Sequence, residues 1–224
     1  MYKRQVLVHG WNGRAAQMAP LAQWIAAAGH VAVAMDAHGH GGSPGTRASW
    51  SGFIEDIAAF ANSLDAPVHA FVGHSAGGLS LMAARRAGRV RAAHYVCVAA
   101  PSHPFPPVQA LRERLGLGPG ALALCRQALA RQLGMSWEQL AACEAWQGAG
   151  PDLLLVYDES DRYIPHTEAD RIGAACPGAT VVKLQGYGHG RILAAAPLAR
   201  EVLRFIGSAQ PAFAQATAGI AQPA

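Results

Sequence analysis

Short apolar runs alternate along this chain with segments of helical periodicity, and this alternation restricts the fold more than any other feature. The runs are uninterrupted, are rich in Val, Leu and Ala, and are followed by turn residues, as in strands that are buried on both faces of a parallel sheet. Alternating strands and helices predict βαβ units, and therefore an α/β fold with a mostly parallel sheet of about six strands flanked by helices. The predicted strands are 5–8, 31–35, 68–72, 95–99, 153–157 and 180–184, and the predicted helices are 18–28, 50–64, 77–87, 167–175 and 197–206.

One long interval, residues 102–150, interrupts this rhythm. It opens with three prolines and then shows helical patterns over 121–133 and 137–146. A connection of this length that contains its own helices indicates a small helical cap over one end of the sheet, although a long crossover with extra helices would give the same pattern. We therefore predict one α/β domain over 1–207 with the insertion at 102–150. The Ala-, Gln- and Pro-rich segment 208–224 is predicted to be a disordered tail.

Composition and charge exclude several classes of protein. Hydrophobic residues make up 51% of the chain and charged residues 14%, which is typical of a chain with a packed core. The net charge is +4, but the basic residues are scattered and form no stripe with interleaved aromatics, so no nucleic-acid partner is expected. The four cysteines form no C-x-x-C pair, and no run is long enough to cross a membrane. We predict a cytoplasmic protein without a membrane association.

A candidate nucleophile lies in Gly73-His74-Ser75-Ala76-Gly77, which matches G-x-S-x-G between a predicted strand and a predicted helix. Nucleophilic attack by a serine requires its hydroxyl to stand clear of the sheet, and a very tight strand-to-helix turn achieves this. Small residues at Gly73 and Gly77 allow the backbone to pass closely, and Ser75 is expected in a strained conformation. The amino end of the following helix then points its free N–H groups toward the reacting carbonyl.

Four further segments extend this pattern, and together they resemble the α/β-hydrolase superfamily. The resemblance covers about residues 5–206, with one departure: the two leading antiparallel strands of that family are absent or shortened here. Residues 9–14 and 188–193 of this chain are similar to loops of a bacterial subgroup described as hydrolases or esterases. The matching segments are His9-Gly10-Trp11, 36–43, 161–165 and Gly188-His189.

The resemblance implies the other parts of the site. Backbone N–H groups of Trp11 and Ala76 would form the oxyanion hole. The acid and the base would follow Ser75 in that order, each on a loop after a carboxyl-terminal strand. His189 fits the base, with His166 as its nearest competitor, and Asp161 fits the acid. Asp158 and Glu159 stay open as alternative acids, with a role as solvated loop charges if they are not catalytic.

A Ser-His-Asp triad predicts acyl transfer to water, and ester hydrolysis is its most common use. Thioester, lactone or C–C bond hydrolysis, acyl transfer, cofactor-free peroxidase chemistry and simple binding on the same scaffold stay open as alternatives. The predicted partner is a small ester with an apolar part. No cofactor or metal is expected, since the loop 36–43 reads as structural and His38-x-His40 lacks a third ligand. Contacts with the substrate are predicted for Trp11, His74 and Phe105.

Overall fold

A single six-stranded sheet, in the order β2-β1-β3-β4-β5-β6, forms the centre of the molecule. The structure is a computed structural model that describes residues 3–207, so the predicted tail 208–224 lies outside the described residues. Every pair of neighbouring strands is parallel, which confirms the predicted fold class, and residues 3–207 contain no leading antiparallel pair. The strands are β1 Arg4–Val8, β2 Val31–Met35, β3 Val68–His74, β4 His94–Val98, β5 Leu153–Asp158 and β6 Thr180–Leu184.

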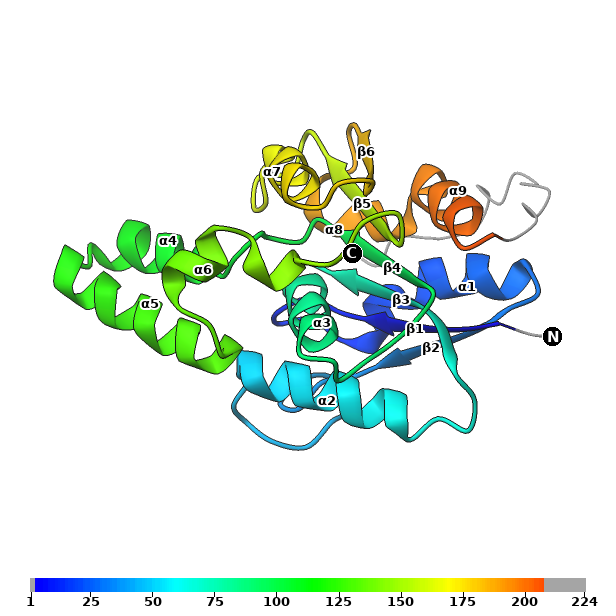
Figure 1. Cartoon of the computed structure of the whole chain (residues 1–224), viewed down its shortest axis with the longest axis horizontal. Helices are drawn as coiled ribbons and strands as arrows, with labels where there is room; N and C mark the ends of the chain where they lie inside the picture. Colours follow the sequence, from blue (N-terminus) through cyan, green and yellow to red (C-terminus); the bar gives the residue numbers. More distant parts are fainter. Residues whose placement is uncertain (1–2, 208–224) are drawn as a thin grey trace, which may run out of the picture.

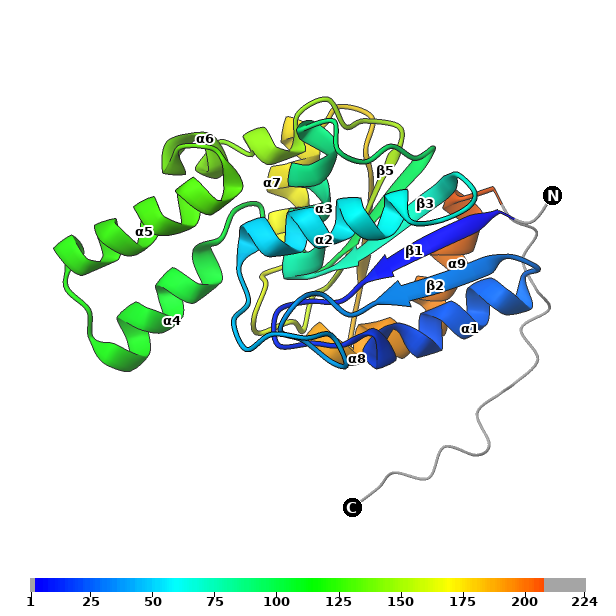
Figure 2. The same cartoon turned by 90° about the horizontal axis from the view of Figure 1, so that it is seen from below.

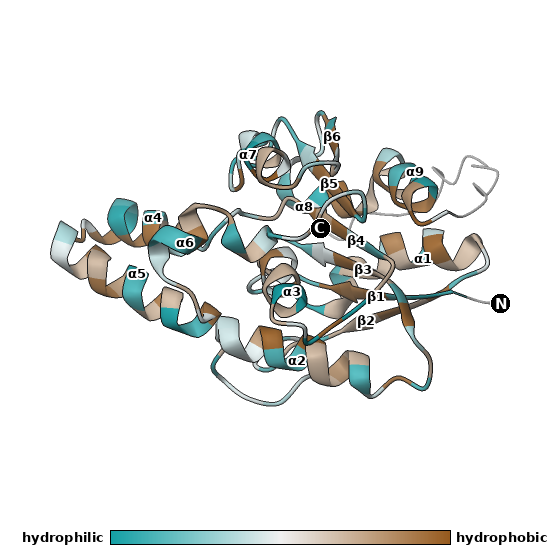
Figure 3. Cartoon of the chain, in the orientation of Figure 1, coloured by the Kyte–Doolittle hydropathy of each residue, from teal (hydrophilic) through white to brown (hydrophobic). Residues whose placement is uncertain are grey.

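Helices cover both faces of the sheet, which explains why its central strands are apolar without alternation. One face packs on α1 and α9, and the other packs on α2, α3 and α7 (Figures 1 and 2). Figure 3 shows the strands of the sheet largely in hydrophobic colours, whereas the helices carry both colours. The bounds are α1 Ala19–Ala27, α2 Trp50–Asn62, α3 Ala76–Arg86, α7 Thr167–Ala175 and α9 Ala196–Phe205, with short elements η1 Ala15–Met18, α8 Gly188–Arg191 and η3 Ile192–Ala194.

The insertion 102–150 is helical, as expected, but its first helix begins at Phe105, before the predicted helical patterns. Its elements are α4 Phe105–Leu115, α5 Pro119–Leu133, α6 Trp137–Ala141 and η2 Glu144–Trp146. Pro106 and Pro107 lie in the first turn of α4, where a missing N–H costs nothing because that N–H has no partner within the helix. The single helix predicted over 137–146 is divided, because Cys143 adopts a positive φ of 61°. Figure 2 shows α4 and α5 side by side, extending away from the sheet.

The strand order reverses at β1, and this reversal positions the site. β1 pairs with β2 on one side and with β3 on the other, and Val8 lies opposite Gly73 in the register of β1 and β3. The loop that carries Trp11 therefore leaves the sheet beside the turn that carries Ser75, at the carboxyl ends of the strands. This is the edge at which open parallel sheets bind their ligands.

No helix within residues 3–207 combines the length and the apolar character that crossing a bilayer would require.

Candidate active site

Ser75 occupies the sharp turn between β3 and α3. Its φ of 53° and ψ of −124° lie outside the regions that non-glycine residues usually adopt. The turn is tight enough that a Cβ on Gly77 would lie 2.2 Å from the carbonyl oxygen of His9, and one on Gly73 would lie 2.6 Å from Cα of Gly78. Both glycines are therefore required by close backbone contacts, as the sequence pattern suggested.

The three predicted triad residues come together at the carboxyl end of the sheet. His189 Nε2 lies 3.1 Å from Ser75 Oγ, and His189 Nδ1 lies 2.7 Å from Asp161 Oδ2. A carboxylate can only accept, so Nδ1 carries the proton, and the lone pair of Nε2 faces the serine hydroxyl. The Asp161 side chain is shielded from solvent, whereas that of His189 is 20% exposed. The arrangement has the order and geometry of a nucleophile, a base and an orienting acid.

Each carboxylate oxygen of Asp161 has a separate task. Oδ1 accepts the backbone N–H groups of Tyr163 and Ile164 at 2.7 and 3.0 Å, and Oδ2 accepts from His189. The backbone bonds fix the rotation of the carboxylate, so that its second oxygen is held toward the imidazole. His189 itself lies within the short helix α8 rather than in the irregular glycine loop that the sequence suggested.

Asp158 has a role that the sequence reading missed. It was considered as an alternative acid or a solvated charge, but it is buried at the end of β5 and does not contact the imidazole. Its carboxylate accepts backbone N–H groups of Ser160, Tyr187 and Gly188 at 2.9 to 3.0 Å. Burial would raise the pKa of Asp158, but these N–H groups outweigh burial and hold the pKa below its ordinary value. One buried carboxylate thus ties the acid loop to the base loop.

His74 was expected to contact the substrate, but it bonds to the backbone of His189 instead. Its Nε2 lies 2.9 Å from the backbone oxygen of His189, and the two rings are 4.7 Å apart. Burial, with a smaller contribution from the neighbouring His189, lowers the pKa of His74 to about 3. The ring is therefore neutral at physiological pH, and its Nε2–H donates to the carbonyl of the base loop. His74 borders only a smaller hollow beside Ser75 and not the main pocket described below.

The two predicted oxyanion residues flank Ser75. Ala76 is the first residue of α3, so its N–H has no partner within the helix. Trp11 follows β1, and hydrogen bonds hold its loop: His40 Nε2 accepts the N–H of Asn12 at 3.2 Å, and Asp36 accepts that of Ala15 at 2.6 Å. Neither the Trp11 nor the Ala76 N–H has a hydrogen-bond partner within residues 3–207. Both remain available to an oxyanion, and the loop 36–43 has the structural role expected of it.

A pocket of about 550 Å³ opens in front of Ser75 and His189. The domain contributes Trp11, Trp50 and Tyr163, and Trp11 and Trp50 pack with their ring centres 5.4 Å apart. Trp50 thus both packs against Trp11 and lines the pocket. Phe105, also predicted to contact substrate, packs instead against His103 at 5.3 Å, because at the start of α4 it faces the core. The insertion contributes Pro106, Pro107, Ala110, Arg114, Leu129 and Gln132.

Comparisons with known proteins agree with the fold. A family model described as the alpha/beta hydrolase family matches residues 5–201. The chain belongs to the alpha/beta hydrolase family. A search of curated protein sequences gives no match.

Solved structures of other proteins share the fold of this α/β hydrolase. One is a structure described under the metagenome-derived lipolytic enzymes LipS and LipT. The alignment covers 92% of this chain and 94% of that one, with a TM-score of 0.69 and 20% identity. Against a bromoperoxidase from Bacillus anthracis the TM-score is 0.67 with 16% identity, and 92% of each chain is covered. Against a thioesterase domain of the curacin biosynthetic pathway the TM-score is 0.64 with 19% identity, covering 92% of this chain and 90% of that one. These likenesses establish the fold and leave the reaction open.

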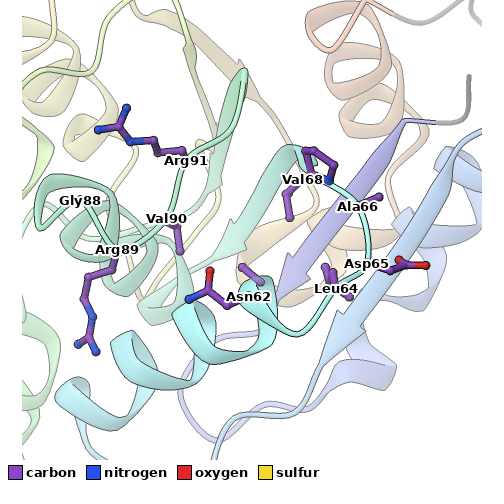
Figure 4. A pocket seen from close by; sticks show the side chains of 11 residues that line it. Asn62, Leu64, Asp65, Ala66, Val68, Gly88, Arg89, Val90 and Arg91 are labelled. Carbon is purple, nitrogen blue, oxygen red and sulfur yellow. The ribbon is translucent and has the colours of Figure 1, made fainter.

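A second cavity, of about 520 Å³, lies at the opposite end of the sheet of this α/β hydrolase, between the loops that precede β3 and β4. Figure 4 shows its two arginines, Arg89 and Arg91, pointing in different directions rather than toward a common point. Its one acid, Asp65, is paired with Arg4 at 2.6 Å. These side chains do not converge on a ligand. Within residues 3–207, no three His, Cys, Asp or Glu side chains form a candidate metal site.

Buried histidines predict that this α/β hydrolase loses stability in mild acid. Burial lowers the pKa of His74 to about 3, and burial followed by the nearby Arg171 lowers that of His103 to about 4, from 6.5 in the unfolded chain. Below pH 6.5 these histidines bind protons in the unfolded chain but stay neutral in the folded chain. The free energy of unfolding therefore falls as the pH falls. Two such groups together should lower the free energy of unfolding by about 2.7 kcal/mol per unit between pH 5.5 and 4.5.

Urea unfolding at a series of pH values measures this slope. A His103→Gln variant should show a shallower slope, because this histidine no longer titrates. An unfolding free energy that stays constant between pH 6 and 4.5 would contradict the prediction.

Proposed function

We propose that this protein is a serine hydrolase that cleaves a carboxylic ester through an acyl-enzyme. The observation that carries the proposal is the continuous row of hydrogen bonds from Ser75 Oγ through His189 to Asp161, at 3.1 and 2.7 Å. Ser75 and His189 line the apolar pocket of about 550 Å³, beside two N–H donors that have no partner within residues 3–207. A serine hydroxyl becomes a useful nucleophile at neutral pH only with such an oriented base.

The reaction proceeds in two transfers. Ser75 Oγ attacks the ester carbonyl while its proton passes to His189 Nε2, and Asp161 stabilises the imidazolium that forms. The N–H groups of Trp11 and Ala76 hold the negative oxygen of the tetrahedral intermediate. His189 then gives its proton to the leaving alcohol, whose C–O bond breaks to leave the acyl-enzyme. Water attacks that ester with the same base, and the acid is released with Ser75 regenerated.

A fluorophosphonate probe tests the proposal directly, because it phosphonylates only an activated serine. Labelling should be confined to Ser75 in a peptide map and should be slowed while excess p-nitrophenyl butyrate is present, because the ester competes for the same serine. A folded protein that neither takes the label nor hydrolyses the ester would refute the serine-hydrolase assignment. It would favour the binding-protein alternative instead.

We further propose that the insertion acts as a cap that selects the chain length of the substrate. Ala110 lies on the pocket side of α4, so Ala110→Trp should fill the space beyond the reacting ester. Hydrolysis of p-nitrophenyl acetate should change little, whereas kcat/KM for p-nitrophenyl octanoate should fall by about ten-fold, since several methylenes lose their apolar contacts. The adjacent Gln109→Trp is the control, because Gln109 is exposed and does not line the pocket. Equal losses for both esters would argue against the cap as the selecting element.

A further inference from the structure

One face of α4 runs along the pocket from the body of the molecule toward the outer end of the insertion. Pro106, Pro107, Ala110 and Arg114 all line the cavity, and their spacing of three and four residues places them on a single face of the helix. At a rise of 1.5 Å per residue, the eight steps from Pro106 to Arg114 span about 12 Å. Figure 2 shows α4 leading outward to the turn that joins it to α5. Arg114 therefore lies at the end of the pocket that is remote from the sheet.

Arg114 brings a positive charge to this pocket, and no side chain within residues 3–207 neutralises it. The neighbouring Glu113 accepts a hydrogen bond from Gln109 at 2.8 Å on the outer side of α4. No aspartate or glutamate lines the pocket, and Arg114 makes no ion pair or hydrogen bond in the described part of the chain. The wall between Arg114 and the reacting serine is mostly apolar, including Ala110 and Leu129. The cavity thus joins a long apolar wall to one cation at its far end.

We propose that the substrate is an ester whose apolar chain ends in a carboxylate, with that carboxylate paired to Arg114 while the ester lies at Ser75. The inference rests on the proposed ester hydrolysis and adds the chemical class of the substrate. The planar guanidinium offers a fork of donors that fits a carboxylate. A positive residue in the last turn of a helix also favours its dipole, but Arg112 shares that turn of α4 without lining the pocket. Arg112 is therefore a matched control.

The test compares two esters with the same number of chain carbons, mono-p-nitrophenyl suberate and p-nitrophenyl octanoate. The measured quantity is the ratio of their kcat/KM values, suberate over octanoate. Arg114→Gln should lower this ratio by about five-fold, which is the upper range for a solvent-exposed ion pair. Arg112→Gln should leave it unchanged. In the unmodified protein the ratio should also fall when the salt concentration is raised from 20 to about 500 mM, because salt screens the pair.

Two outcomes would overturn the inference. A ratio that Arg114→Gln does not change would show that the guanidinium does not contact the carboxylate. A ratio that Arg112→Gln lowers equally would assign the effect to the general positive field of the insertion. Failure of the proposed function would look different: neither ester would then be hydrolysed, or Ser75→Ala would hydrolyse both at the unmodified rate.

Discussion

Replacing Ser75 by alanine is expected to lower kcat for p-nitrophenyl butyrate by about 10⁴-fold or more, and to abolish fluorophosphonate labelling. The variant keeps the pocket, the base and the oxyanion donors, but it has no atom that can form the acyl-enzyme. Binding should survive, so KM or the Kd of an unreactive ester analogue should change little. The measurement is steady-state hydrolysis with titration of labelled protein, after circular dichroism has shown that the variant is folded.

Ser80→Ala is the matched control for this experiment. Ser80 lies in α3, five residues after Ser75, and its Oγ is buried without a hydrogen-bond partner in the described structure. Removing that hydroxyl should leave activity unchanged and should not reduce stability, since an unsatisfied buried polar group costs free energy. Turnover by Ser75→Ala within a few-fold of the unmodified protein would rule out Ser75 as the nucleophile.

Asp161→Asn should reduce kcat by about 10⁴-fold, although it removes only a charge and changes few contacts. Asp161 uses one oxygen for the backbone N–H groups of Tyr163 and Ile164 and the other for His189. Asparagine has a single oxygen. If that oxygen serves the backbone, the amide donates to Nδ1 and forces the proton onto Nε2, where it blocks proton transfer from Ser75. If it serves His189, the amide N–H groups meet those of the backbone. Rates with p-nitrophenyl butyrate measure the loss.

Asp158→Asn is the comparison that separates the orienting acid from the acid that holds the loop. Asparagine at position 158 cannot accept all the N–H groups that Ser160, Tyr187 and Gly188 direct at the carboxylate. The base loop should shift, and a displacement of about 1 Å lowers kcat by about 10²-fold with little change in KM. Unlike Asp161→Asn, this variant should also lose about 1–3 kcal/mol of stability. A larger kcat loss at position 158 than at 161 would reverse the two assignments.

The fold was predictable from local sequence because burial on both faces of a sheet leaves a local signature. Val31–Met35 and Thr180–Leu184 have the predicted bounds, and the other strands differ from prediction by one or two residues. The tight turn at Ser75 was also predictable from local sequence, because the backbone contacts at positions 73 and 77 are close enough to require glycine. Errors arose where local rules conflict. The helix α4 was not predicted, although Pro106 and Pro107 in its first turn are compatible with a helix start.

The surroundings of the site could not be predicted in this way, because they depend on residues far apart in the chain. Asp158 looked like a surface charge beside Glu159, and only the approach of residues 187 and 188 makes it a buried acceptor. His74, beside Ser75, and Phe105, in the apolar insertion, were predicted to contact the substrate. Their side chains instead face the base loop and the core.

By itself, the sequence determined the parallel sheet and the strained serine turn, because strand burial and close glycine contacts leave local patterns; it favoured residues 161 and 189 as partners of Ser75 without excluding Asp158 or Glu159. The tertiary structure alone decided which side chains surround them. It brought the insertion over the carboxyl ends of the strands, so that Ala110 and Arg114 line one cavity with Trp11 and His189. The physical reason is that a pocket wall is set by packing between distant elements. That packing leaves no periodic pattern in the chain.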